Sequence, residues 1–462
     1  MPCIPSRTAA WIASFVFLVS VAILPVGALA DSEEELRAEV EALRGRVAEL
    51  EKLMTDNVQS SQAGSTAPSE KTPRVSFGGQ YRINAYTANS DDGRGAQTAA
   101  RVRIRQDLDF RVTDRFKTHL QVELGHTDSN RTTSSKPLRV RNAVLDYTFK
   151  RGDNFQAGIV PLSDRFGDAL FSSDWDYNPV ALAITSPLWR GELRAFAANL
   201  EEGFETKHHD DFVHYQLDYA LPFDDDTNLN LGGTIATIEG LDGDSHIHAN
   251  YGISGNLALP HGLQLSGFVL GSHTDKQLIL GASGAGNGVA AKIELTSEHG
   301  FGVLATYASG DSDRSGFLPV MALAETYGYW GYTGLLTVQG PTDTGFDGDA
   351  VNVSNNGFGL ATVQVKYARP VTDQFDIHLA AGWFGASDTP GDRDSFVGGD
   401  FLAMGTYHFN GFLALDFGGA YARLGDSVSG YPKGVLSADP FDQPLNDERD
   451  KYSFFTRLQA EF

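Results

Sequence analysis

The sequence predicts an all-β transmembrane fold, a closed antiparallel β-barrel of about eighteen strands. Apolar and polar residues alternate in runs of about 10 to 14 residues from residue 75 to residue 462, with no helical pattern between them. The chain also holds 50 Gly and is 11% aromatic, and its connections alternate between short and long. Because hydrocarbon offers no water to backbone groups, a sheet that spans a bilayer has to close on itself.

The composition excludes several other classes of protein. The single cysteine, Cys3, cannot build a disulfide framework or a cysteine-ligated zinc or haem site. A net charge of -23 argues against nucleic acid as a partner, and 41% hydrophobic residues argue against disorder. No motif calls for a cofactor.

The first 30 residues predict a secretory signal peptide. Arg7 precedes an apolar run that begins at Ala9, and Ala28-Leu29-Ala30 forms a small-residue cleavage site before Asp31. The alternative is a retained transmembrane anchor, because the run approaches the roughly 20 residues that span a bilayer.

Residues 31–56 predict a short periplasmic coiled coil. Apolar residues recur at spacings of four and three on one helical stripe: Leu36, Val40, Leu43, Val47, Leu50 and Met54. The alternative is an amphipathic helix packed on its own protein. Val at heptad position a with Leu at position d favours a coiled coil of two helices, whereas the barrel favours a trimer. Both oligomeric states stay open. Residues 57–74, rich in Ser, Gln, Thr and Pro, predict a flexible linker.

The transmembrane domain is expected at residues 75–462. Val75 and Phe77 alternate with polar residues, and Val102 and Ile104 alternate with arginines, so each strand has one charged and one apolar face. A soluble β-sandwich is the alternative, but it would have shorter strands. Sixteen strands is the alternative count, because the segments around 155–200 are irregular. The expected strand cores are 75–88, 99–112, 116–126, 139–150, 154–161, 180–187, 190–200, 211–221, 227–238, 246–259, 262–273, 288–298, 300–309, 357–369, 374–386, 398–409, 411–424 and 451–462.

The connections predict the orientation of the barrel. Tight turns are expected at 113–115, 151–153, 223–226, 260–262, 298–300, 372–373 and 410–411. Longer polar stretches lie between them at 127–138, 162–179, 310–356, 388–396 and 425–450. Short periplasmic turns and long outer loops are the outer-membrane pattern, and an even strand number returns both ends to the periplasm.

The last strand carries a family resemblance. Tyr452, Phe454 and Leu458 alternate along it, and the chain stops on Phe462. This resembles the C-terminal signature of Gram-negative outer-membrane barrel proteins, which the barrel-insertion machinery reads. The coiled coil is similar to the N-terminal extension of sucrose-specific porins, and Tyr307-Ala308-Ser309-Gly310-Asp311 and Val397-Gly398-Gly399-Asp400 are similar to short segments of alginate-export-type barrels. The resemblance implies a Gram-negative porin.

The lumen is predicted to carry a basic wall. Residues 74–166 hold 16 Lys and Arg against 10 Asp and Glu, whereas residues 167–462 hold 14 against 39. The expected wall consists of Arg82, Arg101, Arg103, Arg105, Arg111, Lys117 and Arg457. The alternative is a structural network in which Asp107 and Asp109 pair with the arginines. Arg139 and Arg141 are in phase with apolar residues and are expected to point outward.

The acidic partner of this wall is expected in residues 162–179. This segment holds Asp164, Asp168, Asp174 and Asp176 among aromatic residues, and it is similar to the inward-folded loop of general porins. An ordinary surface loop is the alternative. Asp311, Asp313 and Ser315 match the start of a calcium-binding loop, but its twelfth position is Ala322, so a solvated acidic loop is favoured and no metal is expected.

We therefore expect an outer-membrane porin, a passive channel for small hydrophilic solutes, with no catalytic residues. The arginine wall favours anionic solutes, while the acidic remainder favours cations. The expected partners are membrane lipid, lipopolysaccharide, small hydrophilic solutes and two further copies in a homotrimer. The alternatives are a sugar- or uronate-specific channel, a structural protein that tethers the outer membrane to peptidoglycan through its coiled coil, and an outer-membrane enzyme such as a phospholipase, for which no Ser-His pair stands out.

Overall fold

The computed structural model describes residues 73–89, 96–128, 138–175, 177–201, 212–239, 244–279, 284–322, 330–337, 351–389, 393–425, 427 and 450–462. The expected signal peptide (1–30), the expected coiled coil (31–56) and residues 57–72 of the expected linker lie outside these ranges. In the described part of the chain, no helix is long and apolar enough to cross a membrane.

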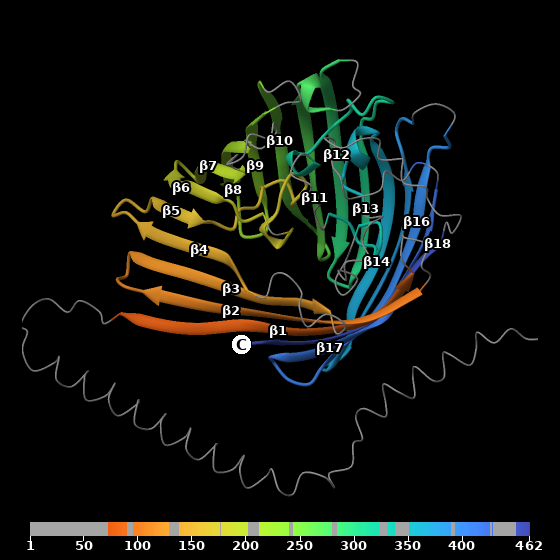
Figure 1. Cartoon of the computed structure of the whole chain (residues 1–462), viewed down its shortest axis with the longest axis horizontal. Coiled ribbons are helices and arrows are strands. Elements are labelled where there is room, and N and C mark those ends of the chain that lie inside the picture. The colour runs from red at the N-terminus through yellow and green to blue at the C-terminus, as the bar shows by residue number, and fades with distance from the viewer. Residues whose placement is uncertain are drawn as a thin grey trace, which may run out of the picture. The chain divides into compact units, whose positions relative to one another are not determined.

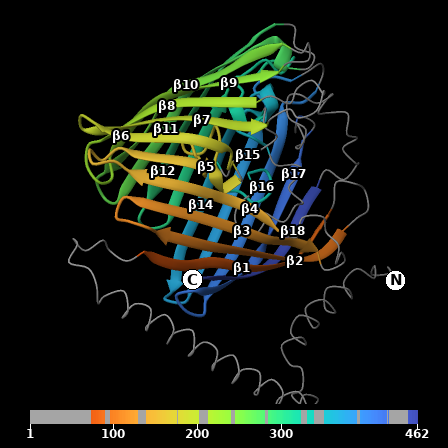
Figure 2. The same cartoon turned by 60° about the vertical axis from the view of Figure 1, so that its left-hand side comes forward.

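The described residues from 73 onward contain eighteen strands, which form one closed antiparallel sheet (Figures 1 and 2). Each strand pairs with its neighbours in the sequence, and β1 pairs with β18, so the sheet has no free edge. The predicted count is confirmed, and every predicted core overlaps an observed strand. The strands are β1 (Arg74–Asn89), β2 (Ala96–Arg111), β3 (Phe116–Asp128), β4 (Arg139–Thr148), β5 (Asn154–Ile159), β6 (Val180–Leu188), β7 (Gly191–Glu201), β8 (Phe212–Pro222), β9 (Asn228–Glu239), β10 (Ser245–Leu259), β11 (Leu263–Thr274), β12 (Gly286–Ser297), β13 (Phe301–Ala308), β14 (Leu360–Thr372), β15 (Phe375–Gly385), β16 (Phe396–His408), β17 (Leu413–Leu424) and β18 (Asp450–Glu461).

Phe462 extends the pairing of β1 with β18 that closes the barrel. The backbone of Phe462 exchanges two hydrogen bonds with Gly79 on β1, with N–O distances of 2.9 and 3.1 Å. The Phe462 ring stacks on Tyr81 at 5.6 Å between centroids. A Cβ at Gly79 would lie 2.5 Å from the carbonyl oxygen of Arg105, so only glycine fits where β1 approaches both neighbouring strands.

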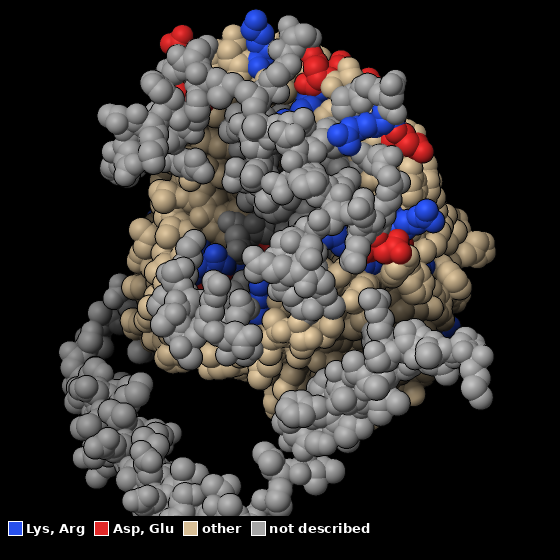
Figure 3. Space-filling view, turned by 45° about the vertical axis from the view of Figure 1, so that its right-hand side comes forward, with Lys and Arg blue, Asp and Glu red and all other residues tan. Residues whose placement is uncertain are grey.

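The two faces of each strand differ as the alternation predicts. On β6, Val180, Leu182 and Ile184 are exposed on the outside, while Ala181 and Ala183 are buried inside. Large exposed apolar side chains recur on the outer face of most strands, which is the pattern of a lipid-facing barrel wall. Figure 3 shows charged residues mainly near the rim and in a hollow, whereas the broad wall beside them carries few.

The ends of the barrel differ in the length of their connections. One end carries tight turns, such as residues 112–115, 149–153 and 189–190, and it also holds the start of β1 and the end of β18. The other end carries the long connections. The described residues of two of these, within 160–179 (loop A) and within 309–359 (loop B), include many that are fully buried. They also contain the short 3₁₀ turns η1 (Ser173–Trp175), η3 (Val320–Ala322) and η5 (Asn355–Gly357), while η2 (Lys276–Leu278) follows β11.

Candidate functional site

The predicted basic residues form a patch on β18, β1 and β2. Pairing of these strands places Arg82 opposite Arg103 on β2 and opposite Gln459 on β18. Arg101 and Arg457 both lie opposite Asn84, one on each side. These positions alternate with the outward apolar residues, and Arg103 and Asn84 are buried in the interior. Five guanidinium groups, those of Arg82, Arg101, Arg103, Arg105 and Arg457, therefore share one inner patch, called here the arginine wall.

Hydrogen bonds and ion pairs hold the arginine wall in place. Arg105 Nε donates to Glu123 at 2.6 Å, and Arg457 Nε donates to Asp416 at 2.7 Å. Arg82 donates to Gln459 at 2.8 Å, and Arg103 donates to Gln80 at 2.6 Å. The Arg101 guanidinium lies 5.7 Å from the centre of the Tyr86 ring. The wall is thus a positioned array of cations with several neutral partners.

Arg111 and Lys117 extend the basic patch toward the short-turn end. They lie opposite each other on β2 and β3, and both are exposed. The alternative, in which Asp107 and Asp109 pair with the arginines, differs from the contacts that the structure shows for these two carboxylates. Asp109 instead accepts from His119 at 2.8 Å, and Asp107 accepts from Gln121 at 2.7 Å.

The expected outward orientation of Arg139 and Arg141 is wrong. A β-bulge shifts the register of β3 and β4 between Gln121 and Val122, which inverts the alternation at the start of β4. Arg139 consequently donates to Glu123 at 2.9 Å, and buried Arg141 donates to the Ser173 carbonyl at 2.9 Å. Arg139 therefore belongs with the charged interior beside the arginine wall.

Loop A folds into the barrel. Its acidic residues do not form one solute-facing row: Asp164 is buried and accepts hydrogen bonds from four backbone N–H groups, of Phe166, Asp168, Leu170 and Phe171. Burial, which is the larger cause, and the nearby Asp168 carboxylate raise the pKa of Asp164 to about 6. The hydrogen bonds from backbone N–H groups lower this pKa in part.

The other acidic residues of loop A differ from Asp164 in their surroundings. Asp168 is partly buried, and burial together with nearby Asp174 raises the pKa of its carboxyl group. Asp174 is exposed, and Asp176 lies outside the described residues. Asp164 therefore shapes the loop, and Asp168 and Asp174 remain as its lumen-facing candidates.

Arg165 anchors loop A to the inner wall of β7–β10. Its guanidinium pairs with Asp218 on β8 at 2.8 Å and with Glu192 on β7, and its carbonyl accepts from Asn230 on β9 and Ser254 on β10. Asp218 is fully buried and also pairs with Arg194 at 2.8 Å. Such a buried, shared carboxylate gives the loop a fixed attachment point.

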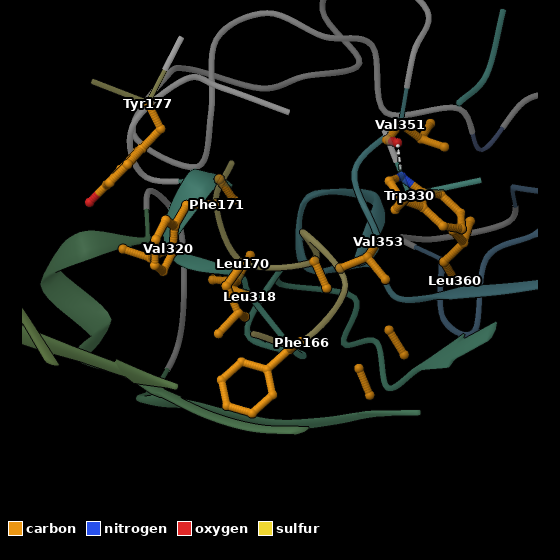
Figure 4. Packing of buried hydrophobic residues seen from close by; sticks show 14 of the residues in the cluster. Phe166, Leu170, Phe171, Tyr177, Leu318, Val320, Trp330, Val351, Val353 and Leu360 are labelled. Carbon is orange, nitrogen blue, oxygen red and sulfur yellow. Dashed lines mark hydrogen bonds between the residues drawn. The ribbon is translucent and has the colours of Figure 1, made fainter. Parts of the chain in front are cut away.

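Aromatic packing supplies a second anchor for loop A. Tyr177 hydrogen-bonds buried His214 on β8. The Phe171 ring contacts His214 edge-to-face at 5.1 Å and Phe196 on β7 at 5.8 Å. The expectation that aromatic residues pack this loop against the barrel wall is confirmed for Phe171 and Tyr177. Phe166, Phe171 and Tyr177 are all fully buried (Figure 4).

Loop B also folds inward, where the sequence reading expected a long polar stretch. Asn250 on β10 donates to the Leu318 carbonyl at 2.7 Å and accepts from Val320 N–H at 3.0 Å. Figure 4 shows Leu318 and Val320 among the side chains of loop A. Farther along, Asp400 on β16 accepts from the N–H groups of Leu335 and Leu336 at 2.8 and 2.6 Å. The two loops therefore share one apolar core inside the barrel.

A second charged cluster lies on β12 and β14, where the sequence reading singled out nothing. Lys292 pairs with Glu294 at 2.8 Å, and Lys366 lies 3.8 Å from the same carboxylate. The Lys366 ammonium also sits 4.1 Å from the centre of the Tyr332 ring in loop B. Lys292 and Glu294 are two residues apart on β12, so the period-two alternation places them on the same face. This spacing could have predicted the cluster from the sequence.

Several solved structures, one of them titled an anion-selective porin, have a similar fold. No protein-family profile and no curated protein matches the sequence. Similar structures include OpdK of Pseudomonas aeruginosa with vanillate, at a TM-score of 0.50 and 11% identity over 84% of this chain and 98% of OpdK. OccK11 (OpdR) of the same organism has a TM-score of 0.49 and 12% identity over 84% of this chain and 96% of its own. An anion-selective porin of Comamonas acidovorans has a TM-score of 0.44 and 9% identity over 84% of this chain and 100% of its own.

The chain has the fold of the outer-membrane porins.

In this porin fold, the two inward loops attach to strands between β4 and β16, whereas the arginine wall lies on β18, β1 and β2. The hydrogen bonds described above join loop A to β4 and β7–β10, and join loop B to β10 and β16. The arginine wall is formed by β18, β1 and β2. Figure 3 shows basic side chains within the hollow of one face.

The calcium-loop residues form successive backbone turns in loop B. The Asp311 carboxylate accepts from Asp313 N–H at 3.2 Å, and the Asp313 carboxylate accepts from Ser315 N–H at 3.2 Å. Across the described ranges, no group of three or more His, Cys, Asp or Glu side chains is placed to hold a metal ion.

Proposed function

We propose that this protein is a passive, water-filled channel of the Gram-negative outer membrane that favours small anionic hydrophilic solutes. The observation that carries the proposal is the arginine wall, five guanidinium groups held by a closed sheet whose outer face is apolar. A membrane barrel with a charged interior and an apolar exterior is suited to conduct ions and small polar solutes.

Electrostatic steering is the proposed mechanism. Fixed guanidinium groups on one wall attract anions that pass along this wall and repel cations. Loops A and B narrow the lumen, so that a solute passes within reach of the wall. Glu123 and Asp416 keep Arg105 and Arg457 in place, at the expense of part of their charge. The selectivity for anions over cations should consequently be moderate, so that both anions and cations pass and anions pass more readily.

Orientation and assembly are further parts of the proposal. We place the short-turn end in the periplasm and the long connections outside, where lipopolysaccharide surrounds the rim. We also propose a homotrimer, a signal peptide, and a periplasmic coiled coil that binds peptidoglycan. These proposals rest on the sequence.

Planar-bilayer recording of the purified full-length protein tests the function. Under a tenfold gradient of KCl, the reversal potential should take the sign of a chloride-favouring channel. A panel of competing organic acids, uronates and neutral sugars then separates a general channel from a sugar- or uronate-specific one. A cation-favouring reversal potential would contradict the proposed role of the arginine wall, and absence of conductance would contradict a channel altogether.

A further inference from the structure

The short-turn rim of the barrel carries its basic residues in one sector only. The turns that join β2 to β3, β4 to β5 and β6 to β7 (residues 112–115, 149–153 and 189–190) contain four basic residues against two acidic ones. The other five described short turns contain no Lys or Arg and five acidic residues, three of them at Asp224–Asp226. The basic residues of the three turns are Arg115, Lys150, Arg151 and Arg190, and all four are exposed.

The three basic turns lie side by side. The carbonyl of Arg115 accepts a hydrogen bond from Thr148 N–H at 2.8 Å, which joins the first turn to the end of β4. A Cβ at Gly152 would lie 3.3 Å from Pro187 Cγ, so the second turn rests on the end of β6. Figure 1 shows the β2–β3 and β4–β5 turns together at its left edge. At about 4.8 Å between neighbouring strands, the sector from β2 to β7 is roughly 24 Å wide.

Exposed aromatic and aliphatic side chains flank these cations. Trp189 is 83% exposed, and Arg190 lies 6.0 Å from its ring centre. Phe149 is exposed next to Lys150, and its ring packs edge-to-face on Tyr147 at 4.9 Å. Amphipathic aromatic rings favour the level of lipid headgroups, and long basic side chains reach from there to phosphates.

We propose that these three turns form a binding surface for anionic phospholipid headgroups, which we call the basic rim. Charge complementarity selects an anionic partner, because the basic rim is the one positive sector of a rim whose other described turns are acidic or uncharged. The exposed aromatic residues beside these cations favour a lipid over a soluble acidic protein. A headgroup bound at the short-turn rim brings its acyl chains against Phe149 and Trp189. The basic rim requires the barrel to lie in a bilayer, but it does not depend on channel activity.

Fluorescence quenching by brominated lipids tests the basic rim directly. The full-length protein is reconstituted in phosphatidylcholine vesicles that contain brominated phosphatidylglycerol or brominated phosphatidylcholine. The Trp189 signal is obtained as the difference between the parent and Trp189→Phe. We expect phosphatidylglycerol to reach half-maximal quenching at a mole fraction about fivefold lower, the factor that corresponds to about 1 kcal/mol for a basic residue at an anionic surface.

Two comparisons decide the interpretation. The variant Arg115→Gln/Lys150→Gln/Arg151→Gln/Arg190→Gln should lose the preference, while the control Lys276→Gln/Arg369→Gln, with exposed cations elsewhere, should keep it. In the unmodified protein, 1 M salt should also remove the preference for phosphatidylglycerol, because the Debye length is then about 3 Å. This second measurement tests the proposal even if the fourfold variant does not fold. Equal quenching by both lipids in the parent, or a preference that survives loss of the four cations, would overturn the proposal.

Discussion

Neutralising Arg101, Arg103 and Arg105 together should reduce or reverse the anion preference of the channel. All three side chains lie on the inner face of β2, and Arg103 lies opposite Arg82 of β1. Glutamine is the substitution of choice because it keeps length and hydrogen bonding. Glu123 retains Arg139 as an ion-pair partner when Arg105 is replaced, so the interior stays paired.

The size of the effect follows from Coulomb's law. One charge about 7 Å from a permeating ion in water contributes about 0.6 kcal/mol, and screening with a Debye length of about 10 Å halves this to about 0.3 kcal/mol. Three charges then contribute about 0.9 kcal/mol, or roughly a 4.5-fold change in permeability. Because anions lose this attraction and cations lose the same repulsion, the anion-to-cation ratio should fall by roughly 20-fold.

Reversal potentials in planar bilayers under a KCl gradient provide the assay. The matched control removes three exposed cations at the short turns, Arg115→Gln/Lys150→Gln/Arg151→Gln, and should shift the potential far less. If the wall variant kept the parent's reversal potential, or if the control shifted it equally, the arginine wall would not be what selects the ion.

Three further predictions concern the loops and the closure of the barrel. Arg165→Gln removes the ion pairs to Asp218 and Glu192 and should loosen loop A by about 1–3 kcal/mol, which would appear as higher and noisier single-channel conductance; an unchanged trace would contradict its anchoring role. The raised pKa of Asp164 means that the folded protein binds more protons here than the unfolded chain between pH 3.8 and about 6, so this group's contribution to stability is lost as pH rises through that window. Asp164→Asn should therefore flatten the pH dependence of thermal unfolding between pH 4 and 6, and parallel curves for variant and parent would refute this. Gly79→Ala would place a Cβ 2.5 Å from the Arg105 carbonyl oxygen and should weaken the β1 closure by about 1–3 kcal/mol, seen as a lower temperature at which the folded band disappears on gels; a parent-like temperature would contradict the close approach.

The number and position of the strands could be predicted because each strand repeats one simple pattern. Val180, Leu182 and Ile184 on one face and Ala181 and Ala183 on the other follow from the pleat alone. The same alternation failed at Arg139 and Arg141, because one extra residue at a β-bulge reverses the faces and leaves no mark in the sequence.

Side-chain partners inside the lumen could not be predicted from the sequence. Asp164 looked like a lumen-facing acid, but it closes a turn of its own loop through backbone N–H groups. Glu123 drew no notice in the sequence, yet it binds both Arg105 and Arg139 because three strands bring them together. Loop B was expected outside, although Phe317-Leu318 and Val320 are apolar enough to have indicated burial.

Cysteine labelling on neighbouring positions of β2 tests most directly whether the sheet encloses water and faces lipid outside. The only native cysteine, Cys3, lies in the expected signal peptide, so each variant should carry a single thiol after cleavage. In the reconstituted channel, Arg105→Cys should react with a charged, water-soluble thiol reagent and the conductance should change. Ile104→Cys should resist that reagent and react only with a lipid-soluble one. Labelling of both positions by the water-soluble reagent, or of Ile104→Cys alone, would contradict a closed barrel with the arginine wall inside.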